Sequence, residues 1–108
     1  MANWLHIAGP AGPILPYYPQ AGVTIANFDY PITPSAAMAA LAETCLDGNI
    51  KSLSFVESDA SCIETEAANL LDAFQKRKGF ILSSGCEIPP EALPENVAAM
   101  VRAVFVKR

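Results

Sequence analysis

The sequence predicts a parallel α/β fold of the (β/α)-barrel type, and three observations lead to this prediction. Short apolar segments alternate with segments of helical pattern along the 108 residues. These short segments read as apolar throughout, which is typical of parallel strands that are covered on both faces. Proline and glycine separate the segments, and no linker, low-complexity tract or coiled-coil heptad interrupts the series. A chain of this length has room for one domain of modest core.

Four segments are expected to form the strands, because each is a short apolar run that a turn signal ends. They are Trp4–Ala8, Val23–Phe28, Thr44–Leu46 and Phe80–Leu82. The third strand is expected to stop at Asp47-Gly48, since Asp-Gly is typical of a turn. Strands that are joined by helical or loop crossovers form a parallel sheet.

The first two crossovers differ in their helical content. Ile14–Gln20 is expected to form only a brief helical turn, because Pro13 precedes it and Pro16 and Pro19 interrupt it. Thr33 is expected to cap a helix over Ser35–Glu43, with Pro34 at the first helical position.

Two further helices are expected in the second half of the chain. Ser58 or Asp59 caps the first, which runs to about Lys78, with cations in its last turn and Gly79 after it. Pro94 opens the second helix. Its inward-facing residues are expected to be Val97, Met100, Val101 and Val104.

Composition excludes several classes of protein. Apolar residues make up 52% of the chain and charged residues 17%, a balance that excludes disorder. The net charge of −4 argues against nucleic acid or an anionic membrane as a partner. No apolar run reaches the roughly 18 residues that span a bilayer, and no secretion signal is visible. The three cysteines do not describe a disulfide framework, so a reducing, cytoplasmic location is expected.

The ligand site is expected where the carboxyl ends of parallel strands meet. His6 lies near the end of the first strand and Cys86 lies in the loop after the last. Imidazole and thiolate are ligands that suit zinc, but two ligands do not complete a tetrahedral site. The alternative for His6 is a core histidine that is hydrogen-bonded to backbone, and Cys86 has the alternative of packing.

Other candidates come from the same loops. Asp29, Asn49 and Glu87 are expected to shape the pocket, with Glu87 able to act as an acid or base. Each has a structural alternative, such as turn capping or plain exposure on a loop. Asp47 at a strand end could orient a histidine. Cys45 and Cys62 are expected to be packing residues.

The segment "GFILSSGCEIPPEALPENVAAMVRAV", residues 79–104, closely resembles the last strand, loop and helix of the uroporphyrinogen decarboxylase superfamily. Upstream, "LHIAG", "GVTIANFDY" and "CLDGNI" resemble the preceding strands in the right order. The superfamily contains decarboxylases of porphyrin biosynthesis and corrinoid-dependent methyltransferases. The resemblance therefore implies the carboxyl-terminal half of a (β/α)8 TIM barrel, with the amino-terminal half absent from this sequence.

The loop position of Cys86 separates the two branches. Decarboxylases carry histidine there, whereas methyltransferases carry a cysteine that binds zinc together with a His-x-Cys pair on an earlier strand. His6 and Cys86 match this set, so the resemblance favours a methylcobalamin:coenzyme M methyltransferase-like protein. In that branch zinc deprotonates the acceptor thiol, which attacks the methyl group on the corrinoid of a partner protein.

Two departures bear on that implication. Ala8 stands where the middle zinc ligand is expected, and Lys51-Ser52 stands where the family tends to have Asp-Pro. The substrate-binding arginines and catalytic aspartate of the decarboxylases belong to the absent half. We therefore expect weak zinc binding and no turnover by this chain alone.

Three functions remain open at this point. The first is a fragment of a zinc-dependent methyltransferase that works with a corrinoid protein. The second is a non-enzymatic half-barrel that binds its missing half, another partner or a second copy of itself, because its sheet edges are unpaired. The third is a uroporphyrinogen decarboxylase, which Cys86 disfavours.

Overall fold

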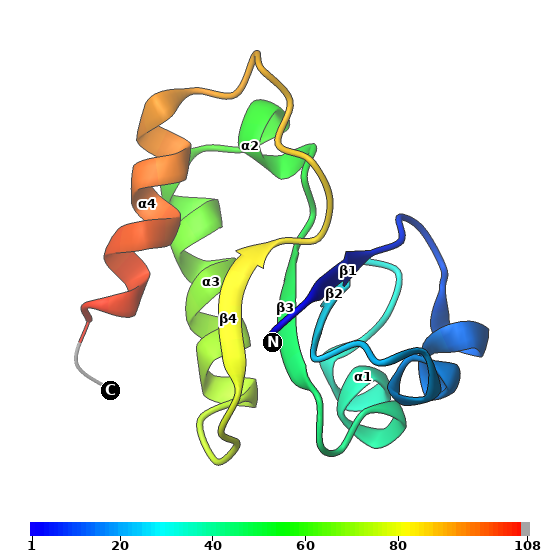
Figure 1. Ribbon diagram of the computed structural model, residues 1–108. Coiled ribbons are helices and arrows are strands. Elements are labelled where there is room, and N and C mark those ends of the chain that lie inside the picture. Colours follow the sequence, from blue (N-terminus) through cyan, green and yellow to red (C-terminus); the bar gives the residue numbers. More distant parts are fainter. Residues whose placement is uncertain (107–108) are drawn as a thin grey trace.

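Four parallel strands form a single sheet, and they lie side by side in the order in which they occur in the chain (Figure 1). The computed structural model describes residues 1–106. The strands are β1 (Trp4–His6), β2 (Ile25–Phe28), β3 (Cys45–Ile50) and β4 (Phe80–Ser84). Every neighbouring pair is parallel, so the predicted parallel α/β class is confirmed.

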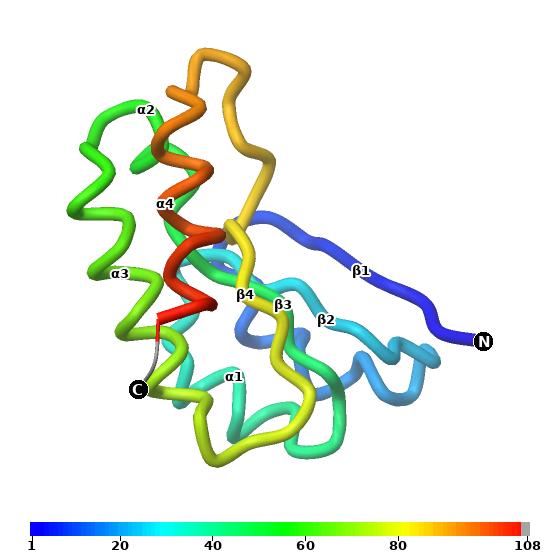
Figure 2. The backbone as a smooth tube through the Cα atoms, turned by 90° about the vertical axis from the view of Figure 1, so that its left-hand side faces the viewer, coloured from blue at the N-terminus to red at the C-terminus, as the bar shows by residue number. Residues whose placement is uncertain are grey.

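Helical segments connect the strands. Two short 3-10 helices, η1 (Gly12–Tyr17) and η2 (Pro19–Ala21), follow β1, as the proline-rich sequence predicts. The α-helices are α1 (Pro34–Ala40), α2 (Ser54–Glu57), α3 (Ala60–Ala73) and α4 (Pro94–Val104). Figure 2 shows α3 and α4 side by side, on the outside of the β3–β4 end of the sheet. No helix in the described residues is long and apolar enough to cross a membrane.

The predicted helix starts are confirmed by their caps. The Thr33 hydroxyl accepts a hydrogen bond from the Ala36 amide at 3.2 Å, and the Asp59 carboxylate accepts one from the Cys62 amide at 2.9 Å. Pro94 is the first residue of α4, where its missing N–H costs no hydrogen bond.

The two faces of the sheet differ in composition. The helix-covered face carries side chains that are completely buried, namely those of Ala26, Phe28, Leu46 and Ile50. Phe74 of α3 stacks on Phe80 with ring centroids 3.9 Å apart. The opposite face, called the open face below, carries Trp4 and one row of residues that are paired in register across the four strands, namely His6, Asn27, Asp47 and Ile81.

Two predictions about the strands were wrong, and the first concerns the end of β3. This strand does not stop at Asp47-Gly48 but continues to Ile50. The strands are also not apolar throughout, because Asn27, Asp47 and Asn49 are buried within them. Each of the three makes hydrogen bonds to residues that are distant in the chain, so a local pattern does not reveal them.

The ends of two helices also differ from the prediction. α1 ends at Ala40 and α3 at Ala73, both earlier than predicted. Arg77 lies beyond α3, and its guanidinium donates to the carbonyls of Leu41 and Thr44 at 2.5 and 2.6 Å. The short helix α2 was not predicted.

The inward face of α4 was predicted correctly for Val97 and Met100, which are partly buried against the core, but wrongly for the other two valines. Val101 and Val104 are 50% and 52% exposed. The buried residues of α4 are instead Asn96, Ala99 and Ala103, because small side chains allow the close approach of α3. The amide of Asn96 donates to the carbonyls of Phe55 and Ser58 and so ties α4 to the α2–α3 junction.

Candidate functional site

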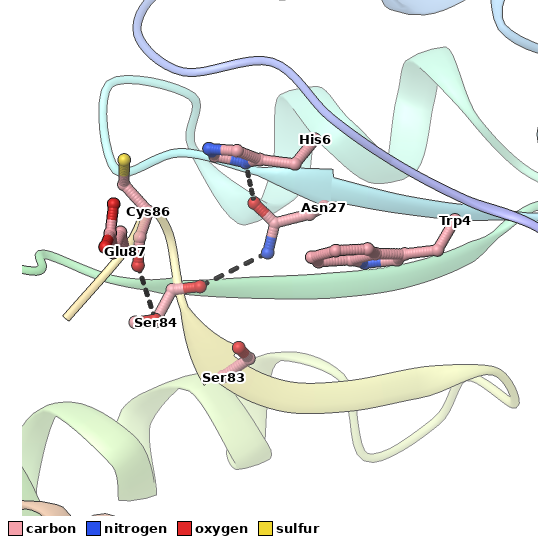
Figure 3. A pocket seen from close by; sticks show the side chains of 7 residues that line it. All are labelled: Trp4, His6, Asn27, Ser83, Ser84, Cys86 and Glu87. Carbon is pink, nitrogen blue, oxygen red and sulfur yellow. Dashed lines mark hydrogen bonds between the residues drawn. The ribbon is translucent and has the colours of Figure 1, made fainter.

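A pocket of about 310 Å³ opens at the carboxyl ends of the strands, where the sequence predicts the ligand site (Figure 3). Side chains from β1, β2, β4 and the loop after β4 line it. They are Trp4, His6, Asn27, Ser83, Ser84, Cys86 and Glu87. The pocket therefore brings together His6 and Cys86, which are 80 positions apart in the chain.

His6 is half-buried, and two neighbours orient its ring. Its Nδ1 atom lies 2.6 Å from Oδ1 of Asn27. The Trp4 ring is stacked near it, with centroids 6.4 Å apart and an interplanar angle of 17°. The contact of His6 is thus to a side chain rather than to backbone, and the other ring nitrogen, Nε2, points toward the Cys86 side of the pocket (Figure 3).

Backbone contacts hold the loop that carries Cys86. The Cys86 amide donates to the hydroxyl of Ser52 at 3.1 Å, and the Ser84 hydroxyl donates to the Cys86 carbonyl at 2.6 Å. Ser52 belongs to the Lys51-Ser52 pair that departs from the family pattern, and here it fixes the backbone of Cys86.

Gly85 allows the close approach of this loop to the one after β2. A Cβ atom at Gly85 would lie 2.7 Å from Oδ1 of Asp29 and 2.9 Å from the Tyr30 nitrogen. The Gly85 amide also donates to the Ile50 carbonyl at 2.8 Å, which continues the β3–β4 pairing. Only glycine fits this position without a shift of backbone.

A second pocket, of about 340 Å³, adjoins the first. Cys86 and Glu87 line both pockets, and the remaining lining residues of the second are Asp29, Tyr30, Lys51, Ser52, Leu53 and Pro89. The Lys51 ammonium lies 5.2 Å from the centre of the Tyr30 ring, a cation–π distance. Glu87 is exposed, so its carboxylate is accessible from both pockets.

Asp29 and Asn49 are buried and act mainly on the backbone of these loops. The Asp29 carboxylate accepts hydrogen bonds from the amides of Gly9 and Tyr30, both at 2.8 Å. The Asn49 amide donates to the carbonyls of Asp29 and Ile32 at 3.2 and 2.7 Å. Asp29 lines the second pocket, whereas Asn49 shapes it only through the position of the loop after β2.

Asn27, Trp4 and Ser84 are site residues that sequence reasoning missed. Asn27 is 3% exposed, and its amide donates to Oδ2 of Asp47 at 3.3 Å and to the Ser84 carbonyl at 3.2 Å. Oδ2 of Asp47 also accepts from the Trp4 indole nitrogen at 2.8 Å. A polar residue inside an otherwise apolar strand was the available signal for Asn27.

The remaining cysteines lie away from the two pockets. Cys45 is partly buried at the start of β3, where burial raises the pKa of its thiol, Asp47 raises it further and Arg77 lowers it. Cys62 is exposed on α3, so the prediction that it packs in the interior was wrong. The sequence pattern did not show which face of α3 it occupies.

The residues of the site fit zinc in kind but not in number. His6 and Cys86 supply a nitrogen and a sulfur ligand, whereas three protein ligands are the minimum in most zinc sites. Among residues 1–106, no group of three or more His, Cys, Asp and Glu side chains is arranged to hold a metal ion. Ala8, at the expected third position, has no ligating group. We therefore assign no chemical step to a metal on this chain.

A series of parallel βα units with its site at the carboxyl ends of the strands defines a protein of the (β/α)-barrel class. The chain belongs to the uroporphyrinogen decarboxylase (URO-D) family, whose model matches residues 2–105. No curated protein sequence gave a match.

A solved structure is similar to this chain over nearly its whole length. It is a methyltransferase from Methanosarcina mazei, with a TM-score of 0.83 and 27% sequence identity. The similarity covers 94% of this chain and 30% of that one, so the chain spans less than a third of the neighbour's length. The predicted family, its methyltransferase branch and the half-barrel fold are confirmed.

Proposed function

We propose that this chain is part of a zinc-dependent, corrinoid-linked methyltransferase, which moves a methyl group between a corrinoid and a thiol or a similar acceptor. Family membership and the similarity to a methyltransferase support this proposal. The observation that carries it is the shared pocket of His6 and Cys86, since these match two of the three residues that the methyltransferase branch uses for zinc.

The roles of the residues follow from their positions. Nε2 of His6 and the Cys86 thiolate would hold zinc, and they would hold it weakly because Ala8 supplies no third ligand. Asp29, Asn49 and Glu87 shape the space for the acceptor, with Glu87 as the exposed acid or base. The corrinoid resides on a partner protein. Methyl transfer requires that partner and the other half of the barrel, so this chain alone has no turnover.

Titration of the purified chain with Co²⁺, a spectroscopic substitute for zinc, tests the metal assignment. The proposal predicts a thiolate-to-cobalt charge-transfer band that Cys86→Ser abolishes. Cys62→Ser is the matched control, because Cys62 is an exposed cysteine outside the pocket, and it is expected to leave the band unchanged. An identical band in the Cys86→Ser and wild-type proteins would reject Cys86 as a ligand.

A second function, association through the sheet edges, is favoured by a separate observation. β1 pairs only with β2 and β4 only with β3 among the described residues. Exposed apolar side chains occur on these two strands, on α4 and directly after it, at Trp4, Ile81, Val101, Val104 and Phe105. Unpaired strand edges with apolar surroundings favour pairing with another chain. The partner is an amino-terminal half-barrel or a second copy. A decarboxylase is the least supported alternative, because Cys86 replaces the histidine of that branch.

Light scattering with size-exclusion chromatography tests self-association. If the partner is a second copy, we expect a dimer that Val104→Glu dissociates, because Val104 lines an exposed apolar hollow together with Leu82 of β4. Val56→Glu on α2 is the control, since Val56 is also exposed but lies on another element. A monodisperse monomer at all concentrations argues against self-association and leaves the half-barrel as the partner to be tested by co-expression.

A further inference from the structure

The orientation of the Asn27 side chain determines which nitrogen of His6 carries a hydrogen. Nδ2 of Asn27 lies 3.2 Å from the Ser84 carbonyl and 3.3 Å from the Asp47 carboxylate. A carbonyl is an acceptor only, as is an ionised carboxylate, so the NH₂ group of Asn27 must face them. The Asn27 oxygen therefore faces His6, and Nδ1 of His6 must be the donor in their 2.6 Å hydrogen bond.

The elements that hold this arrangement are the strands themselves. His6, Asn27 and Asp47 are direct register partners on β1, β2 and β3. Side chains of such partners point to the same face and lie within hydrogen-bonding reach. Asn27 and Asp47 are 3% and 6% exposed, so water does not compete for these contacts. These contacts can therefore fix one tautomer of the His6 ring.

We propose that Asn27 is a positioning residue that keeps neutral His6 in the Nδ1–H tautomer, while Asp47 and the Ser84 carbonyl set the orientation of Asn27. The Nε2 lone pair is then left free on the side of the ring that points to the Cys86 side of the pocket (Figure 3). This lone pair can bind a metal or accept a proton. Its use as a zinc ligand rests on the proposed function, whereas the tautomer itself does not.

The tautomer decides whether a lone pair or an N–H group of His6 faces the pocket. In water, free neutral histidine prefers the opposite tautomer, with hydrogen on Nε2, and that form would direct an N–H group into the pocket. Hydrogen-bonded partners of this kind orient ligating histidines in metal sites, and their loss typically lowers metal affinity by about 10–100-fold. Asn27 thus acts through His6 and not on a ligand directly.

The single histidine of this chain makes the tautomer directly measurable. Nitrogen-15 NMR of the labelled ring, at a pH where an ordinary imidazole (pKa about 6.5) is neutral, separates the nitrogen that bears hydrogen from the one that bears a lone pair. We expect Nδ1–H in the wild-type chain. A wild-type spectrum with hydrogen on Nε2 would overturn the proposal without the need for any variant.

One variant and one control test the role of Asn27. Asn27→Leu keeps the size but removes the acceptor, so the ring is expected to revert toward Nε2–H. Ser83→Ala removes another hydroxyl that lines the pocket and should leave the tautomer unchanged. Retention of Nδ1–H in a folded Asn27→Leu chain would contradict the proposal.

Cobalt binding by the same proteins separates the two proposals. Nδ1–H in the wild type together with a roughly tenfold or greater loss of Co²⁺ affinity in Asn27→Leu supports both of them. Nδ1–H in a wild-type chain that binds no Co²⁺ supports the positioning role and rejects only the metal assignment.

Discussion

On the helix-covered face of the sheet, Phe28, Leu46 and Phe80 pack against helix residues and make contacts that do not depend on hydrogen bonds. On the open face, His6, Asn27 and Asp47 occupy one register row and depend on hydrogen bonds between the strands. The same β-strands thus stabilise the fold with one face and build a site with the other. Mutations on the two faces should therefore have different consequences, and the following predictions are ordered from the largest expected effect to the smallest.

Truncation of the core on the helix-covered face should cost the most stability. Phe28 is 0% exposed, and its ring centroid lies 6.1 Å from that of Phe74. Phe28→Ala should lower the free energy of unfolding by about 3–5 kcal/mol, as urea denaturation measures it. Ile81→Ala on the open face is the control, and it should cost less than about 1 kcal/mol because Ile81 is 46% exposed. Equal losses from the two substitutions would mean that the open face is also a packed core.

A methyl group at the mouth of the pocket should have the next largest effect. Gly85→Ala places its Cβ 2.7 Å from Oδ1 of Asp29 and 2.9 Å from the Tyr30 nitrogen, so the two loops must separate. Overpacking of this kind typically costs about 1–3 kcal/mol, and displacement of Cys86 should also weaken the cobalt charge-transfer band. Gly12→Ala is the control, because a Cβ there meets nothing within 4 Å. If Gly85→Ala leaves both stability and the band unchanged, the close packing of these loops is incorrect.

The smallest effect concerns the amino end of the open face, where Cys45 lies beside Asp47. Burial first, and then the Asp47 carboxylate, raise the pKa of the Cys45 thiol above its ordinary value. A raised pKa means less thiolate at a given pH, so alkylation of Cys45 should be slower than that of exposed Cys62 near pH 8. The difference should shrink as the pH rises through the Cys45 pKa. Mass spectrometry after timed alkylation measures both rates, and faster modification of Cys45 would contradict this description.

The helix-covered face was largely predictable from sequence. Caps are local signals, and Thr33 and Asp59 begin their helices as predicted. The buried face of α3 carries Ile63, Ala67 and Leu70, which recur at helical spacing in the sequence. These predictions succeeded because hydrophobic periodicity and capping depend on residues a few positions apart.

The open face was predictable only in part. The convergence of His6 and Cys86 on one pocket followed from the rule that strand ends meet at one edge of a parallel sheet. The partners of His6 did not follow, because Asn27 and Asp47 are about 20 and 40 positions away and only strand register brings them together. Asp47-Gly48 was wrongly predicted to be a turn, although it lies inside β3, because its pairing with the neighbouring strands is also a long-range contact.

The convergence of His6 and Cys86 is the claim on which the site depends, and paramagnetic relaxation tests it most directly. A nitroxide label is attached to Cys86 in a Cys45→Ser, Cys62→Ser chain, and the ring signals of the single histidine are recorded by NMR. The control carries the label on Cys62, with Cys45 and Cys86 replaced by serine. The structure predicts that the label on Cys86 broadens the His6 signals strongly and that the label on Cys62 broadens them much less. Equal broadening, or stronger broadening from Cys62, would contradict the shared pocket.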